Sequence, residues 1–94
     1  MFEWDPVKAE ANLRKHGVSF DEAATVFLDP EGLDGPDELH SHAESRRRRL
    51  GTSVQHRVLI VAYTVRRTGH AETIRLISAR HASRRERAAY RAKD

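Results

Sequence analysis

Arginine side chains that could bind phosphate are concentrated near the end of the chain, in the segment ETIRLISARHASRRERAAYR at residues 72–91. Arg75 and Arg80 lie on or at the end of a strand-like run, and Arg84 follows in an arginine-rich stretch of helical character. A guanidinium group presents a planar fork of N–H donors that matches two oxygens of a phosphate. The segment therefore predicts a surface that binds a polyanion.

Two side chains of this segment could take part in proton transfer or base recognition. Glu86 could act as a general base, because nearby cations keep a carboxylate ionised. It also stands three residues after Ser83, which is the spacing of a helix capping box. Tyr90 lies one helical turn after Glu86, where it could stack on a base, donate to a phosphate, or pack against a sheet.

Histidine and lysine offer further proton-transfer groups, since histidine titrates near neutral pH. His81 follows Arg80 directly, and His16 follows Lys15 at the end of an expected first helix. A histidine at such a position can also serve only to bind the last carbonyl groups of the helix. The spacing leaves the general base open among Lys15, His16, His81, Glu86 and Tyr90.

Metal and cofactor chemistry has little support in the sequence. His40 and His42 lie two residues apart in an acidic stretch, but no further ligands follow at the spacing of a metal site. The chain has no cysteine, and it contains no dinucleotide-binding, Walker or zinc-protease motif. We therefore predict neither a metal ion nor a cofactor.

Acidic and basic residues separate along the chain. The first 44 residues contain three basic and 11 acidic residues, whereas the remainder contains 14 basic and three acidic residues. All but three of the 17 basic residues are arginines. Such a basic half predicts a polyanionic partner whose binding weakens with salt. The alternative is an ordinary arginine-rich surface.

The length of 94 residues predicts a single domain that spans residues 1–94. No run of about 18 apolar residues could cross a membrane. The N-terminus also lacks a basic segment followed by an apolar core, so no secretion signal is expected. We expect a cytoplasmic protein without a membrane partner.

Two helices are expected in the first third of the chain. Asp5 and Pro6 are typical of a helix start and Gly17 of a left-handed helix end, which predicts a helix over residues 6–16. Its inward face is predicted at Val7, Ala9, Ala11 and Leu13.

Ser19 and Glu22 form a second capping box, and Pro30 would end the helix that follows. The buried stripe of this second helix is predicted at Phe20, Ala23, Ala24 and Phe27.

The remaining chain predicts strands and a last helix. Residues 29–44 form an acidic loop, with a short strand near residues 32–33. Residues 46–52 predict a charged edge strand. The apolar run at residues 58–65 predicts a central strand.

A turn at residues 66–70 then leads to an antiparallel strand over residues 72–80. Along this strand, alternation places Arg75 and Arg80 on opposite faces unless the strand ends or bulges between them. Ser83 would start the last helix, which reaches about Arg91. The expected fold is α+β, with two N-terminal helices, an antiparallel sheet of three to four strands and a C-terminal helix. A further strand at residues 2–4 is possible.

Taken together, these residues resemble the BrnT family, which consists of small toxins of type II toxin–antitoxin systems with a RelE-like ribonuclease fold. The resemblance is carried by FEWDPVKAEANLRKHGVSFDEAATVFLDP at residues 2–30, by residues 44–46 and Gly51, and by IRLISARHASRRERAAY at residues 74–90. It implies an endoribonuclease that cleaves mRNA and inhibits translation. It also implies a cognate BrnA-like antitoxin with a ribbon-helix-helix part, through which alone the toxin would reach DNA.

The resemblance also implies the site residues. The matching signature positions are Lys15, His16, Arg46, Arg75, Ser78, Arg80, Glu86 and Tyr90. RNA carries its own nucleophile, the 2′-hydroxyl, so preorganised arginines that stabilise the phosphorane would suffice without a metal. We predict catalytic roles for Arg80, Arg75, Glu86 and His16. We predict RNA-binding roles for Lys15, Arg46, Arg84, Tyr90 and His81.

Two other classes of function remain compatible with the sequence. One is a non-catalytic basic module that binds RNA or a protein partner. The other is a structural subunit whose acidic and basic halves pair head to tail.

Overall fold

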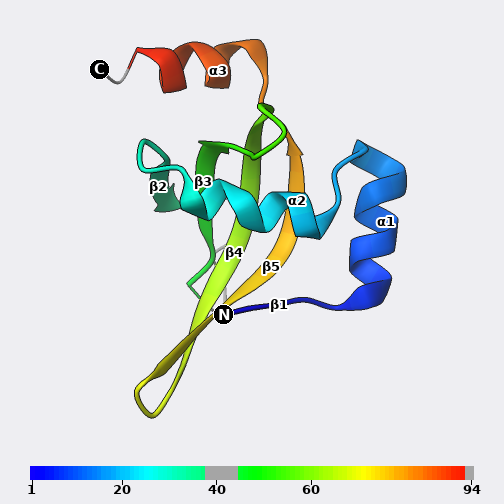
Figure 1. The fold of residues 1–94 in the computed structure, drawn as a ribbon, viewed down its shortest axis with the longest axis vertical. Helices are drawn as coiled ribbons and strands as arrows, with labels where there is room; N and C mark the ends of the chain where they lie inside the picture. The colour runs from blue at the N-terminus through cyan, green and yellow to red at the C-terminus, as the bar shows by residue number, and fades with distance from the viewer. Residues whose placement is uncertain (38–44, 93–94) are drawn as a thin grey trace.

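The computed structural model describes residues 1–37 and 45–92. In this part of the chain, three α-helices and one 3-10 helix pack on a five-stranded sheet (Figure 1). This is an α+β fold, as expected. No helix within the described ranges is long and apolar enough to cross a membrane.

The first helix, α1 (Pro6–His16), begins and ends where the sequence predicts. The Asp5 carboxylate accepts from the Val7 N–H at 2.8 Å, and Gly17 closes the helix with φ 68°. The predicted inward face was wrong at three of its four residues, however. Val7, Ala11 and Leu13 are exposed, whereas Ala9 is partly buried and packs against the core, and the buried residue of α1 is Asn12. In Figure 1, α1 lies beside the β5 edge of the sheet and does not cross its face, so it needs no wide apolar stripe.

The second helix, α2 (Phe20–Ala24), is shorter than expected because it continues as the 3-10 helix η1 (Thr25–Leu28). Ser19 caps α2 by accepting from the Glu22 N–H at 3.0 Å. The Glu22 carboxylate, however, binds Ser53 and Arg57, so only half of the predicted capping box forms. The predicted stripe does face the core, with Phe20 and Ala23 buried and Ala24 and Phe27 packed against them.

The sheet has the order β1-β5-β4-β3-β2. Its strands are β1 (Phe2–Glu3), β2 (Leu33–Pro36), β3 (Arg47–Thr52), β4 (Val58–Thr68) and β5 (Ala71–His81). β1 runs parallel to β5, whereas all other pairs are antiparallel. The expectation of a purely antiparallel sheet of three to four strands was therefore wrong.

β3 is an inner strand, which corrects the prediction that residues 46–52 form an edge. β2 pairs with it from Leu33↔Leu50 to Pro36↔Arg47. The charges that suggested an edge are neutralised locally. Arg49 forms an ion pair with Asp34 and also donates to the Val26 carbonyl at 2.9 Å. Charged side chains that have such partners are compatible with an inner strand.

A β-bulge sets the faces of β5. Its register against β4 shifts between Ala62↔Ser78 and Tyr63↔Leu76, which leaves Ile77 as the extra residue. Leu76 and Ala79 consequently both enter the same core. Arg75 pairs with Thr64 and Arg80 with Ile60, so the two arginines lie on the same face of the sheet after all.

The two faces of the sheet are covered differently. The larger core, around Val18, Phe20, Leu59 and Val61, fills the face beneath α2 and η1. On the other face, the last helix α3 (Arg84–Arg91) packs at one end, where Tyr90 and Ala82 contact Leu50 and Ile60. Because α3 is short, it covers only this end of the face.

Candidate functional site

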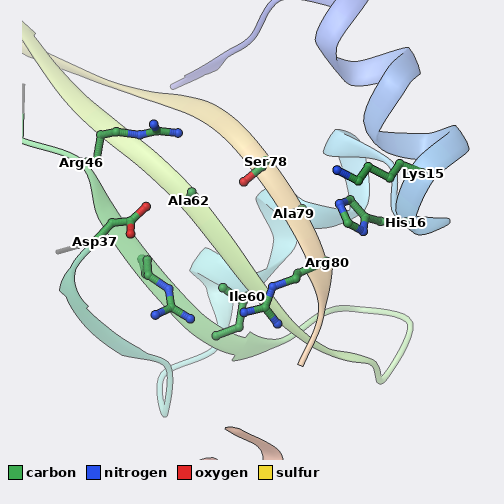
Figure 2. Close-up of a pocket in the computed structure, with 10 residues that line it drawn as sticks. Lys15, His16, Asp37, Arg46, Ile60, Ala62, Ser78, Ala79 and Arg80 are labelled. Atoms are coloured by element: carbon green, nitrogen blue, oxygen red, sulfur yellow. The ribbon is translucent and has the colours of Figure 1, made fainter. Parts of the chain in front are cut away.

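A basic pocket of about 440 Å³ occupies the sheet face beside α3 (Figure 2). Its cationic side chains come from the end of α1, from the start of β3 and from β5, and they are Lys15, Arg46, Arg48 and Arg80. His16, Ser78 and one carboxylate, Asp37, complete the polar lining, and Ile60, Ala62 and Ala79 form the rest. This arrangement suits an anionic ligand that presents several charged oxygens.

Arg80 is held at the pocket by Glu86. Its Nη1 donates to Oε1 at 2.8 Å and its Nη2 to Oε2 at 3.0 Å, which makes a bidentate pair. Arg48 donates to the same Oε2 at 3.0 Å. The capping box predicted at Ser83 is also present, with the Ser83 N–H donating to Oε1 at 2.8 Å.

These contacts define the charge state of Glu86. The Arg80 guanidinium, helped by the Ser83 N–H, lowers the pKa of the Glu86 carboxyl to about 2. A group that holds its proton so weakly is a poor general base at neutral pH. The geometry therefore gives Glu86 a structural and electrostatic role and offers little support for a proton-transfer role.

Lys15 and His16 reach the pocket because a buried side chain ties α1 to β5. The Asn12 amide donates to the Ala79 carbonyl at 2.8 Å and to the Val18 carbonyl at 3.0 Å. The Asn12 Oδ1 accepts from the Ala79 N–H at 3.1 Å. The last turn of α1 is thereby fixed against the strand that carries Arg80. Sequence reasoning missed this residue, although an asparagine inside a helix was an available signal.

Arg48 is a second residue that sequence reasoning missed. It belongs to the run of four arginines at residues 46–49, in which composition cannot distinguish one residue from the next. The sheet register distinguishes them, because Arg48 pairs with Ala62 on the pocket face. Arg47 and Arg49 point to the opposite face, where they donate to Tyr63 and to the Val26 carbonyl.

Several predicted site residues lie away from the pocket. Arg75 donates to Glu3 at 2.7 Å and does not line the pocket, although it shares the face of Arg80. Arg84 is exposed in the first turn of α3. His81 is exposed, with its Nε2 3.4 Å from the Arg57 Nη1.

Tyr90 is only 9% exposed, and its hydroxyl donates to the Asp29 carboxylate. The Thr52 hydroxyl lies 3.1 Å from the same oxygen. Burial, together with the bond to Asp29, raises the pKa of the Tyr90 phenol. Of the three roles open from the sequence, the position of Tyr90 supports packing against the sheet. It leaves little ring surface for stacking on a base, and the hydroxyl already donates to Asp29.

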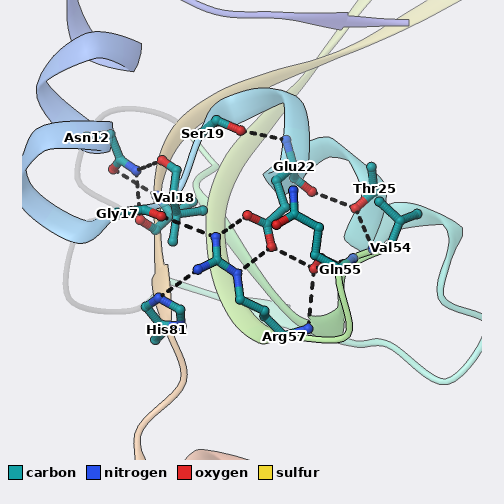
Figure 3. Close-up of polar contacts among 12 residues, drawn as sticks. Asn12, Gly17, Val18, Ser19, Glu22, Thr25, Val54, Gln55, Arg57 and His81 are labelled. Carbon is teal, nitrogen blue, oxygen red and sulfur yellow. Dashed lines mark hydrogen bonds and ion pairs between the residues drawn. The ribbon is translucent and has the colours of Figure 1, made fainter.

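A polar cluster around the buried Glu22 carboxylate lies near the end of β5, where His81 lies beside Arg57 (Figure 3). The Arg57 Nε donates to Glu22 Oε2 at 2.8 Å, and the Ser53 hydroxyl donates to the same oxygen at 2.7 Å. The Arg57 guanidinium lowers the pKa of the Glu22 carboxyl. Arg57 also donates to the Gly17 carbonyl at 3.2 Å. The cluster thus joins the β3–β4 connection to the segment between α1 and α2.

Metal binding finds no support in the described ranges, where no three His, Cys, Asp or Glu side chains are placed to hold an ion together. The pair His40 and His42 lies outside the described residues.

The fold and the pocket define a small α+β protein with a cationic site on one face of its sheet, a class suited to binding a phosphate chain. The family described as "Ribonuclease toxin, BrnT, of type II toxin-antitoxin system" matches residues 4–86. The chain therefore belongs to the BrnT family of ribonuclease toxins, which confirms the resemblance drawn from the sequence. Membership implies an RNA substrate and an antitoxin partner.

The fold comparison agrees with this assignment. The structure of the Brucella abortus ribonuclease toxin BrnT superposes with a TM-score of 0.65 over 89% of this chain and 99% of that chain, at 24% sequence identity. At this level of identity the likeness shows a shared fold. No curated protein sequence matches the chain.

Proposed function

We propose that this toxin is an endoribonuclease that cleaves mRNA, with Arg80 stabilising the negative charge that develops on the scissile phosphate. The observation that carries the proposal is the shared pocket of Arg80, Lys15 and His16, which come from opposite ends of the chain. A strand that fixes a guanidinium group beside two proton-transfer candidates suits phosphoryl transfer.

The proposed reaction uses the RNA as its own nucleophile. The 2′-hydroxyl oxygen bonds to the adjacent phosphorus, and the bond from phosphorus to the next 5′-oxygen breaks. One proton leaves the 2′-hydroxyl for a base, and another is supplied to the departing 5′-oxygen. The products are a 2′,3′-cyclic phosphate and a 5′-hydroxyl end, and no metal ion takes part.

Within this proposal the residues of the pocket have different roles. Arg80 neutralises the pentavalent phosphorane, and Arg46 binds a neighbouring phosphate. His16 and Lys15 are the candidates for proton transfer, because both line the pocket. Glu86 has less support as the base, because its pKa of about 2 leaves it weakly basic.

We further propose that the antitoxin is a BrnA-like protein with a ribbon-helix-helix part that covers this basic pocket. The toxin would then contact DNA only indirectly, through that antitoxin. The charge of the pocket supports such a partner, since an inhibitor must cover or neutralise the surface that binds RNA.

The first prediction tests Arg80. Arg80→Ala should lower the rate of RNA cleavage by about 10²- to 10³-fold, because it removes a preorganised donor to the transition state. Purified protein is incubated with RNA and EDTA, and the fragment ends are analysed for 2′,3′-cyclic phosphate.

Arg14→Ala is the matched control. Its side chain is 71% exposed on α1 and lies outside the pocket, so cleavage should be unchanged. Full activity of Arg80→Ala would contradict the assigned role. Retarded but intact RNA with the unmodified protein would instead favour a non-catalytic binding module.

A further inference from the structure

We infer that Glu86 is a positioning residue that fixes Arg48 and Arg80 side by side, so that the two guanidinium groups together bind one phosphate of the RNA. The inference rests on the proposed function and adds Arg48 to the residues that contact the substrate. It also gives Glu86, the third residue of α3 and part of its capping box, a role in the reaction.

One carboxylate organises both arginines. Oε2 of Glu86 accepts from the Nη2 of Arg80 and from the Nη2 of Arg48, each at 3.0 Å. Oε1 accepts from the Nη1 of Arg80 and from the Ser83 N–H, each at 2.8 Å. Four donors therefore fill the acceptor capacity of the carboxylate.

The position of the carboxylate is tied to the backbone. Ser83 and Glu86 form a reciprocal capping box, in which the Glu86 N–H also donates to the Ser83 hydroxyl at 3.1 Å. The start of α3 therefore holds the Glu86 side chain in place, and Glu86 in turn holds the arginines. Without the Glu86 carboxylate, the two positively charged guanidinium groups would repel each other and move apart.

Both arginines keep donors for a ligand. Arg80 uses Nη1 and Nη2 for Glu86, and within the described residues its Nε makes no hydrogen bond. The Nε–H and the second Nη2–H lie on the other edge of the guanidinium fork, where a phosphate can bind with two oxygens. Arg48 contacts Glu86 through Nη2 alone.

The exposed fractions of the three side chains agree with this arrangement. The side chains of Arg48 and Arg80 are 37% and 42% exposed, whereas that of Glu86 is 23% exposed. Both arginines line the 440 Å³ pocket, and Glu86 lines a neighbouring pocket that it shares with Arg48. The carboxylate thus lies behind the arginines as seen from the pocket, and it does not itself line the place where a phosphate would bind.

The test is a double-mutant cycle of Glu86→Gln and Arg48→Ala. Binding is measured by fluorescence anisotropy with a 2′-O-methyl RNA oligonucleotide, which cannot be cleaved. Glu86→Gln should weaken binding roughly tenfold, because a glutamine loses the charge that holds both guanidinium groups. In the Arg48→Ala background the same change should weaken binding clearly less, since half of the pair is already absent.

Two controls separate this role from others. Ser83→Ala weakens the helix cap but keeps the carboxylate, so it should bind nearly as tightly as the parent; an equal loss would attribute the effect to fraying of α3. The pH profile of cleavage should keep its shape in Glu86→Gln. Loss of its acidic limb with unchanged binding would make Glu86 the general base and overturn the inference.

Tighter binding by Glu86→Gln would also overturn it, because the carboxylate would then compete with phosphate. If the losses of affinity caused by Glu86→Gln and Arg48→Ala were additive, the inference would be overturned as well. The binding measurement does not depend on cleavage. A protein that binds with this coupling but never cleaves RNA would therefore refute the ribonuclease mechanism and retain the role of Glu86.

Discussion

A single buried amide, Asn12, determines whether the two ends of the pocket meet. Asn12 is 8% exposed and makes three hydrogen bonds to the backbone of Val18 and Ala79. Ala79 directly precedes Arg80, so the amide sets the distance between the end of α1 and the arginine. At the scale of the residue, the site therefore depends on Asn12, a side chain that does not itself line the pocket.

The second prediction concerns this amide. Asn12→Ala leaves one N–H and two carbonyl groups buried without their partner, so the free energy of unfolding should fall by about 3 kcal/mol. Urea denaturation measures this change. Lys8→Ala, on an exposed position of the same helix, should stay within about 0.5 kcal/mol of the parent. Equal stabilities of the two variants would show that the amide contributes nothing.

At the scale of elements, the turn between α1 and α2 directs the chain from the edge of the sheet to its face. Gly17 has φ 68°, and its N–H donates to the Leu13 carbonyl at 2.9 Å, which ends α1. Only residues 17–19 separate the two helices. A left-handed residue reverses the chain within this short length, and Ser19 then starts α2.

The third prediction compares two glycines. Gly17→Ala should lower the free energy of unfolding by about 1 kcal/mol, because an alanine is strained in the left-handed region. Gly35→Ala is the control, since both positions offer open space for a Cβ and only Gly17 has a positive φ. Thermal unfolding should show a lower midpoint for Gly17→Ala alone. Similar midpoints for both variants would show that the left-handed backbone at Gly17 does not require glycine.

At the scale of the whole molecule, the acidic and basic halves of the sequence neutralise each other within one chain. Ion pairs join Glu3 to Arg75, Glu22 to Arg57 and Asp34 to Arg49. These pairs give little support to a subunit that assembles head to tail through its charges. The pocket gathers four cationic side chains, Lys15, Arg46, Arg48 and Arg80, against the carboxylates of Asp37 in its lining and of Glu86 beside it, so a positive charge remains there.

The fourth prediction follows from this residual charge. RNA binding should weaken as salt rises, because cations condensed on the phosphates are released on binding. The double variant of Arg48→Ala and Arg80→Ala should reduce the slope of log affinity against log salt by about 0.7, the value for the one single-strand phosphate that both arginines bind. Arg14→Ala should leave the slope unchanged, as its side chain pairs with Glu10 outside the pocket. Equal slopes for the parent and all variants would show that the RNA binds away from Arg48 and Arg80.

Local sequence rules explain what could be predicted without a structure. Asp5, Gly17 and Ser83 mark helix ends because a cap depends on residues within about four positions along the chain. The apolar run at residues 58–65 identified the central strand for a similar reason, since its composition fits a strand that is buried on both faces. The family signatures at both ends of the chain identified the BrnT family.

The sequence by itself thus determined where the three α-helices start, the central strand and the family, whereas the tertiary structure decided which side chains form the site. The bulge at Ile77 put Arg75 and Arg80 on one face, and Glu3 then paired with Arg75. The pairing of β3 with β4 selected Arg48 from four consecutive arginines. Strand register and burial depend on residues far apart in the chain, so a local pattern of charges carries no information about them.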